Sequence, residues 1–436
     1  MIGVARFPDD DAACGWWHLQ GGPNPYPRVS GHISCDYAIV GAGWTGLAAA
    51  HRLAVNHPNA QIAVIDAGQI GFGAAGRNSG FLYDLPFVFP ADAFRGREDD
   101  GRQEISLYRS GIEHLRQFVH QHGADCGWAE IGQYHAAAGE DGERELALIA
   151  TGLENLGESF RSLTQSERNN ELGTDYYRGA IHTPGTVQVN PLALLRAYAD
   201  GLPENVALYE RSPASAIEPG AETRVVAGEG SVTASKILLT TNAFLNAFSG
   251  IRPRILPLMT FAGLTAPMER DGKPLPLGDA PWGVVPASLF GTSMRRLADN
   301  RLLVRTTYAY APRFRASRSL REKAIRRQLL SLHRRFPEID DFPLDWNWGG
   351  VISLFRNANG FFGEIAPRIF AATSAGMPVC IAYGQQLAEY ASGNDGKDLD
   401  FVCRRSQPGT LPPQPFVGPI AQSAAAWRQF RARKEI

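Results

Sequence analysis

The chain has little lysine, little cysteine and almost no net charge. Among its 436 residues only five are lysine and five are cysteine, and the formal net charge at pH 7 is −1. A near-zero charge gives no general field for a polyanion, so nucleic acid is not expected as the main partner. The cysteine count is odd and no C-x-x-C pair occurs, which argues against a disulfide framework or a structural zinc site and favours a reducing cytoplasm.

Long apolar runs are also missing. No stretch reaches the length needed to span a bilayer, and the acidic first eleven residues lack the basic and apolar regions of a signal peptide. His, Asp and Glu residues with the spacing of metal ligands do not occur, so no metal site is expected. The remaining composition, 44% hydrophobic and 20% charged, is that of a globular protein with one or two domains. We therefore expect a cytoplasmic protein.

The informative stretch is 36–66. An apolar run of strand type leads into Gly41, Gly43 and Gly46, and these open a helical segment. A second apolar run, 61–65, ends on Asp66, twenty residues after Gly46. Strand, glycine turn, helix, second strand and acid together form the dinucleotide-binding fingerprint.

Each position of this fingerprint has a physical role. Gly41 permits the tight turn, Gly43 lets a pyrophosphate approach the backbone, and Gly46 lets the helix pack closely on the strand. The helix N-terminus, including Trp44 and Thr45, offers free N–H groups and a positive dipole end to phosphates. A carboxylate at Asp66 can accept hydrogen bonds from ribose hydroxyls.

The run after Asp66 distinguishes FAD from NAD. Five glycines lie within 68–80, and such a backbone can pass flat beside a planar ring. The front of the chain resembles the FAD-dependent amine and amino-acid oxidoreductases of the D-amino-acid-oxidase-like family, in particular the gamma-glutamylputrescine-oxidase-like branch. This sequence has Ala75 and Ser79 where that branch has Ser and Gly. The resemblance implies cofactor contacts from Ala67, Gly73, Ala74, Ala75, Gly76, Arg77, Asn78, Ser79 and Gly80.

Three later stretches carry the same resemblance. The strand 236–243 ends in Thr241, Asn242 and Ala243, which implies residues near the cofactor, and Ala214 matches a backbone position that contacts adenine. Near residue 376 the family has G-x-G ahead of a helix that points at the flavin, and we expect that helix over 379–392. Here the run is Gly376, Met377 and Pro378, so the close-approach glycine is lost, while proline in a first helical turn preserves the dipole.

The resemblance and the pattern of segments predict an α/β fold. It combines a discontinuous FAD-binding Rossmann-like domain (33–90, 180–250 and 346–400) with an interleaved α+β substrate domain on a mixed β-sheet (91–179 and 251–345). A lead-in (1–32) precedes them, and a tail (401–436) is expected to wrap the surface and end in a short basic helix.

We expect a lid at 87–100, helices at 103–122 and 143–163, and a strand at 127–134. Strands at 264–267, 282–285 and 301–310 are expected in one sheet. Asn190 and Pro191 are a natural helix start.

Candidate substrate-site residues lie in the second half of the chain. They are Arg305, Tyr308, Trp348 and Arg356, and an arginine facing the flavin would clamp a carboxylate. In a regular strand Tyr308 and Tyr310 share one face and Arg305 takes the other. The basic helix 318–336 has no interleaved aromatics, which favours a solvated face over a nucleic-acid patch.

The family oxidises a C–N bond by hydride transfer to flavin N5, giving an imine that water hydrolyses. This chemistry needs no dedicated acid or base, and none is evident. We expect FAD to be bound without a covalent link, with Cys380 free, and an amine or amino acid as substrate with O2 or another electron acceptor.

Two alternatives stay open. A flavin monooxygenase would need a G-D pair before a helix, and Gly278-Asp279 lacks that context. The altered turn at Gly376, Met377 and Pro378 keeps open a family member that binds FAD without catalysis.

Overall fold

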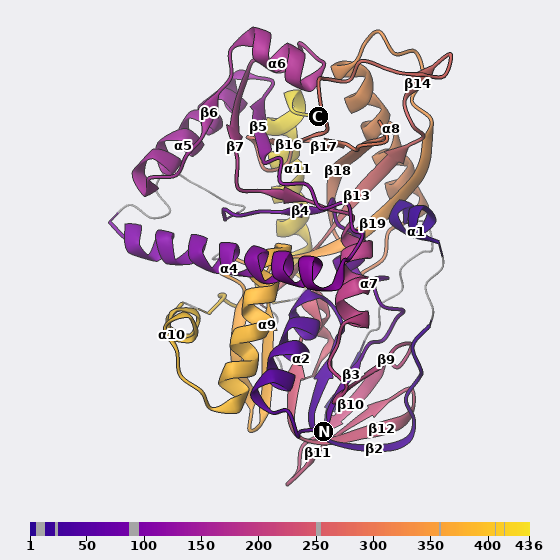
Figure 1. Cartoon of the computed structure of the whole chain (residues 1–436), viewed down its shortest axis with the longest axis vertical. Coiled ribbons are helices and arrows are strands. Elements are labelled where there is room, and N and C mark those ends of the chain that lie inside the picture. The colour runs from indigo at the N-terminus through magenta and orange to yellow at the C-terminus, as the bar shows by residue number, and fades with distance from the viewer. Residues whose placement is uncertain are drawn as a thin grey trace.

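The computed structural model describes residues 1–5, 14–21, 25–86, 96–249, 254–356, 359–405, 407–413 and 415–436. Most of the expected lid (87–100) and Asn357 lie outside these residues. Two sheets organise the chain, and they occupy opposite ends of the molecule in Figure 1.

The first sheet has nine strands. Its order is β1 (Ile2–Gly3), β10 (Ala214–Glu218), β11 (Thr223–Ala227), β12 (Glu229–Leu239), β2 (Ser30–Val40), β3 (Ile62–Ile65) and β9 (Val206–Tyr209), with β21 (Ile369–Thr373) beside β12 and β20 (Phe361–Ala366) beside β21. The pairs β12–β2, β2–β3, β3–β9 and β12–β21 are parallel. Every residue of β3 and β21 is buried, as expected for parallel strands covered on both faces.

Helices cover this sheet on the side of α2 (Trp44–Asn56), which packs on α9 (Met377–Ser392) (Figure 1). α4 (Glu98–His122) and α7 (Pro191–Asp200) lie next to them. α7 begins as predicted, because the Asn190 side chain accepts hydrogen bonds from the amides of Leu192 and Ala193, both at 3.1 Å, and Pro191 occupies the first turn.

The second sheet has eight strands and is mixed. Its order is β19 (Leu344–Leu354), β13 (Leu256–Thr265), β18 (Leu302–Tyr310), β17 (Ser293–Arg296), β16 (Trp282–Pro286), β5 (Gln133–Ala137), β7 (Gly179–Thr183) and β6 (Arg161–Ser162). Only the β16–β5 pair is parallel. The three strands predicted in the region after residue 260 do share this sheet. The sheet also extends past the predicted domain boundaries at 180 and 346, which fall inside β7 and β19.

The remaining elements are short or peripheral. They are α1 (Gly15–Gln20), α3 (Ala74–Arg77), β4 (Phe81–Leu82), α5 (Glu140–Leu156), α6 (Gln165–Leu172), β8 (Val187–Gln188), η1 (Asn242–Ala247), β14 (Glu269–Arg270), β15 (Lys273–Pro274), α8 (Arg318–Arg335), α10 (Lys397–Arg404), α11 (Val417–Arg431) and η2 (Ala432–Lys434). The predicted α/β fold with an interleaved second sheet is confirmed.

Several predicted bounds were wrong. The strand expected over 127–134 begins only at Gln133, since Gly127 and Gly132 have positive φ angles that an extended strand does not allow. The helix expected over 143–163 ends at Leu156, where Gly157 is left-handed. α9 begins at Met377, two residues earlier than expected, with Pro378 in its first turn. The tail does not merely wrap the surface, because α11 packs on β18.

Candidate functional site

One large cavity joins the two sheets. It has a volume of about 2200 Å³ and reaches from the glycine turn after β2 to β18 and α11. Most residues predicted from the sequence to form the site line it, namely Gly41, Gly43, Trp44, Thr45, Asp66, Ala67, Gly73, Ala74, Ala75, Arg77, Asn78, Ser79, Ala214, Thr241, Asn242, Gly376, Met377, Arg305, Tyr308, Trp348 and Arg356.

Four predicted cofactor residues do not line the cavity, and their surroundings explain why. A Cβ on Gly46 would lie 1.8 Å from the carbonyl oxygen of Gly41, and one on Gly76 would lie 2.3 Å from that of Gly71. Gly80 has a φ of 77°, and its Cβ would meet Arg295. Ala243 is fully buried in the core. These positions therefore shape the backbone behind the cavity.

The glycine turn presents backbone to the cavity. Gly41 has a φ of 107°, which favours glycine. A Cβ on Gly43 would touch only the Cβ of Ala75, at 3.6 Å, so the N-terminal end of α2 is open on its cavity side. The first amides of α2 have no partner within the helix and are available to an anion.

Asp66 is fixed at the end of β3 by two backbone amides. Its Oδ2 accepts from Ala42 at 2.8 Å and its Oδ1 from Gly68 at 2.9 Å. Burial raises the pKa of this carboxyl, and the two amides act against that shift. Each carboxylate oxygen can accept further hydrogen bonds, so ribose hydroxyls remain compatible with this arrangement.

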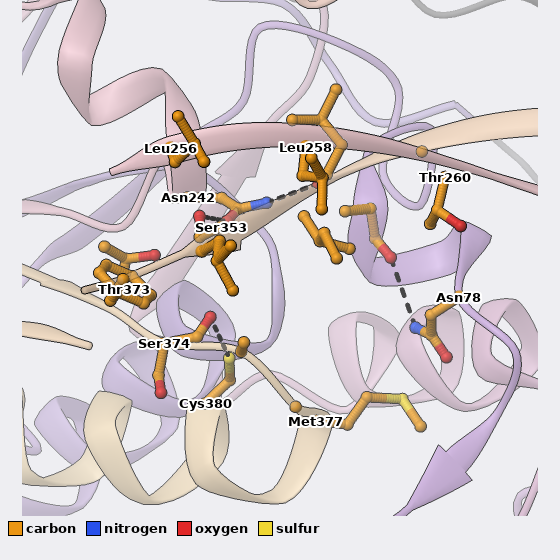
Figure 2. Close-up of a pocket in the computed structure, with 18 of the residues that line it drawn as sticks. Asn78, Asn242, Leu256, Leu258, Thr260, Ser353, Thr373, Ser374, Met377 and Cys380 are labelled. Carbon is orange, nitrogen blue, oxygen red and sulfur yellow. Dashed lines mark hydrogen bonds between the residues drawn. The ribbon is translucent and has the colours of Figure 1, made fainter. Parts of the chain in front are cut away.

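A partly apolar slot lies in the cavity between β13 and the N-terminal end of α9. Figure 2 shows Leu256, Leu258 and Thr260, on alternate positions of β13, above Ser374 and Met377 at the N-terminal end of α9. Alternate strand residues share one face, which places these three side chains in a row. If a planar ring lies between this row and the helix end, the helix dipole would favour negative charge on the ring.

Polar groups also line this part of the cavity. Asn242, held at a φ of 50°, donates from Nδ2 to the carbonyl of Val351 at 3.2 Å, and the hydroxyl of Ser353 donates to its Oδ1 (Figure 2). The hydroxyl of neighbouring Thr241 is buried and has no hydrogen-bond partner among the described residues. A buried polar atom without a partner is costly and suits contact with a bound polar group.

Three indole and guanidinium groups hold the loop at 73–80. Trp44 Nε1 donates to Ala75 at 3.1 Å, Arg77 Nε donates to Gly349 at 2.7 Å, and Trp348 Nε1 donates to Arg77 at 2.9 Å. Trp348 is fully buried and packs edge-on against Trp16 at 6.4 Å. Its contacts make it a support of the loop as well as part of the cavity wall.

Arg295 on β17 completes this support and was missed by the sequence reading. Its Nη1 donates to the carbonyls of Ser79, Val189 and Gly80 at 2.7, 2.8 and 3.2 Å, and its Nε donates to Gln188 at 2.9 Å. Burial lowers its pKa to about 9. No sequence motif identifies an arginine 215 residues from the loop it binds.

A bulge in β18 brings Arg305 and Tyr308 to one face. Across the β13–β18 pair, Thr260 is opposite Tyr308 while Phe261 is opposite Thr306, so Thr307 is an extra residue. Thr307 has a φ of 60°, as bulge residues can. Arg305 then donates to the Tyr308 hydroxyl, and to Ser293 at 2.5 Å. The predicted opposite orientation of Arg305 was wrong, because it assumed a regular strand.

The cavity contains further residues that the sequence did not indicate. Gln133 and His135 on β5 and Tyr83 all line it beyond Arg305. Burial lowers the pKa of His135 to about 4, so this histidine is neutral at pH 7. Arg356 lies at the exposed rim, where its Nη1 donates to Thr410 at 3.4 Å. The alternation of side chains along β5 can be inferred from the sequence. The pairing of β5 with β16, however, is a feature of the tertiary structure.

The described residues fit an FAD better than a metal. The open turn at Gly43, the carboxylate of Asp66, the apolar slot and the unpartnered Thr241 hydroxyl suit a dinucleotide with a planar ring. Across the described ranges no cluster of three or more His, Cys, Asp or Glu could hold a metal ion. Nor does any helix within those ranges combine the length and apolar character that crossing a bilayer requires.

Comparison with known proteins agrees with this geometry. Residues 36–390 match the model of the DAO family, described as FAD dependent oxidoreductase. The chain is 26% identical to gamma-glutamylputrescine oxidoreductase of Escherichia coli, covering 94% of this chain and 95% of that protein. It is 24% identical to the probable oxidoreductase OrdL of Haemophilus influenzae, with 85% and 86% covered. Glycine oxidase from Geobacillus kaustophilus has the same fold, with a TM-score of 0.71, 20% identity, and 86% and 100% covered. This protein is therefore an FAD-dependent oxidoreductase and belongs to the DAO family.

Proposed function

We propose that this enzyme oxidises a C–N bond of an amine or of an N-substituted amino acid, giving an imine that water hydrolyses. The observation that carries the proposal is the single cavity in which the dinucleotide cradle at Gly41–Asp66 continues into a chamber walled by Arg305 and Tyr308. The names of its relatives, which act on amines and amino acids, support the same reaction class.

FAD, when bound, supplies the hydride acceptor. The chain's own residues bind and orient the cofactor and the substrate. The cradle residues and the loop at 73–80 would hold the dinucleotide, with Asp66 on the ribose and the α2 N-terminus at the pyrophosphate. Leu256 and Leu258 keep water from one face of the slot. The residues that line the cavity need provide no acid or base for this reaction.

Arg305 is our candidate for recognising the substrate. Its guanidinium has five N–H donors, and its hydrogen bonds to Tyr308 and Ser293 leave donors for a ligand. These two bonds also fix the plane of the group, which favours two parallel hydrogen bonds to a carboxylate. The proposed substrate therefore carries a carboxylate in addition to its reacting amine.

We propose that FAD is held without a covalent bond. Cys380 lines the cavity, but burial raises the pKa of its thiol to about 11 and the thiol donates to the Ser374 carbonyl at 3.5 Å. The thiolate needed for covalent attachment is therefore scarce at neutral pH. Acid precipitation should release all of the flavin into the supernatant, and yellow colour in the pellet would contradict this. A cytoplasmic location, inferred from the cysteine pattern, and O2 or another electron acceptor complete the proposal.

The deciding experiment is an anaerobic titration of the purified, FAD-loaded protein with a divided pool of amines and amino acids. Bleaching of the visible flavin band by a carboxylate-bearing amine is expected. A band that no member of the pool changes would contradict the proposed substrate class and favour a binding protein without this activity. Arg305→Met should raise the substrate concentration needed for bleaching, whereas Arg301→Met, which removes an arginine paired with Asp299 and Asp345 just before β18, should not.

A further inference from the structure

The C-terminal helix exposes a row of large apolar side chains. Phe416, Ile420, Trp427 and Phe430 are 62%, 55%, 62% and 56% exposed. Among the described residues nine large apolar side chains are at least 38% exposed, and these four all belong to α11 and the residue that caps it. Such clustering on one element is unlike the scattered exposure found on most protein surfaces.

The four side chains form one stripe. At about 100° per residue they fall within an arc of about 80°, along about 21 Å of helix. The opposite face is buried on the protein through Val417, Ala421, Ala425 and Gln429. We call Phe416, Ile420, Trp427 and Phe430 the aromatic stripe. The rings of Trp427 and Phe430 stack on one another with centroids 6.0 Å apart.

Basic residues flank the aromatic stripe on both sides. On the side that lines the cavity lie Arg428 and Arg431. On the other side α8 runs next to α11, because Arg327 donates to Gln429 and Arg334 donates to the carbonyl of Arg433 at 3.1 Å. The exposed cations of the two helices and η2 are Arg318, Lys323, Arg326, Arg334, Arg428, Arg431, Arg433 and Lys434. Their only exposed acid is Glu322, already paired with Arg318 at 3.0 Å.

This local charge is notable in a chain whose net charge is −1. It argues against a second copy as the partner, since a two-fold contact would bring the same cations together. Protruding rings bordered by arginine and lysine are instead the composition of helices that lie in the headgroup region of a membrane. A fluid headgroup layer accepts such rings without a complementary groove.

We propose that the aromatic stripe of α11, with the basic residues around it, binds the surface of a membrane that contains anionic lipids. Binding here would place Ile420, Arg428 and Arg431, which are exposed and also line the cavity, beside the lipid surface. The proposal is independent of the substrate. It requires only that α11 keeps the packing that the structure shows.

The test is flotation of the full-length, FAD-loaded protein with vesicles. We would compare phosphatidylcholine alone with phosphatidylcholine plus phosphatidylglycerol, at low and at physiological salt. Binding to the anionic vesicles that weakens with salt is expected. The double variant Trp427→Ser, Phe430→Ser should bind about tenfold more weakly or worse. The matched control Val55→Ser, Leu148→Ser removes two apolar side chains exposed by 68% and 46% elsewhere and should bind normally.

Three results would overturn the proposal. The first is a wild-type protein that floats with neither kind of vesicle. The second is a stripe variant that binds as well as the control. The third is light scattering that shows a dimer which the stripe variant converts to a monomer, because the occupant would then be a second copy.

Discussion

Replacing Arg295 by methionine is expected to weaken FAD binding without touching the cavity. The guanidinium donates four hydrogen bonds, three of them to the backbone carbonyls of Ser79, Gly80 and Val189. Two of these carbonyls end the loop at 73–80. Methionine has a similar length but no donor, so all four acceptors lose the guanidinium inside a buried region, while the Gly80 carbonyl keeps its bond from the Val189 amide at 2.9 Å.

The magnitude follows from two opposing effects. A hydrogen bond to a charged group contributes about 1.5–3 kcal/mol, whereas removing a buried charge recovers part of its desolvation cost. We expect a net loss of about 3 kcal/mol in the free energy of unfolding. At about 2.1 cal/mol/K per residue, 436 residues give an unfolding entropy of about 0.9 kcal/mol/K, so Tm should fall by about 3 °C.

FAD affinity is the more sensitive measure. If half of the lost stabilisation, about 1.4 kcal/mol, had been holding the loop in its FAD-binding form, the Kd for FAD rises about tenfold. The assay is titration of the apoprotein with FAD, followed by flavin fluorescence. Arg296→Met is the matched control, because neighbouring Arg296 donates to Asn300 and Gly278 at 2.7 Å and to Ala280 at 3.0 Å, none of which belongs to the loop. A Kd unchanged in Arg295→Met, or raised equally in both variants, would refute the reasoning.

Three further predictions concern the cradle and buried histidines. Gly46→Ala should cost about 3 kcal/mol and abolish FAD retention, since its Cβ would overlap the Gly41 carbonyl, whereas Gly396→Ala, with nothing within 4 Å, should not; denaturant unfolding and flavin content decide. Asp66→Ala should raise the Kd for FAD at least about tenfold, because the amides of Ala42 and Gly68 lose their acceptor; an unchanged Kd would remove Asp66 from the site. Burial lowers the pKa of His51 and His135 to about 4, so the unfolded chain takes up protons first as pH falls below about 6.5 and stability is lost down to about pH 4. At pH 5 each histidine should cost about 2 kcal/mol relative to pH 7.5 in urea unfolding, and His51→Gln should reduce the loss; an equal loss in that variant would contradict the assignment.

The local sequence was sufficient to predict those parts of the site whose function depends on the conformation of the backbone. The turn at Gly41 to Gly46 and the acid at Asp66 could be recognised because a strand, a close backbone approach and a helix start require particular residue types at fixed spacing. The same holds for Asn190 and Pro191, whose capping role is decided within four residues. The family and its cofactor were predicted from the resemblance that these motifs and the run after Asp66 carry.

Tertiary structure decided which side chains meet. Thr307 gives no sign in the sequence that it is an extra residue, yet its bulge turns Arg305 toward Tyr308. No local sequence pattern distinguishes Arg295 from other arginines, and only the folded sheet places it next to the loop at 73–80. Similarly, α11 forms part of the cavity wall because it packs on β18. The sequence by itself determined the dinucleotide cradle, because its geometry is local. The substrate chamber arises from strand register and from contacts between residues more than a hundred positions apart, and only the folded chain specifies those.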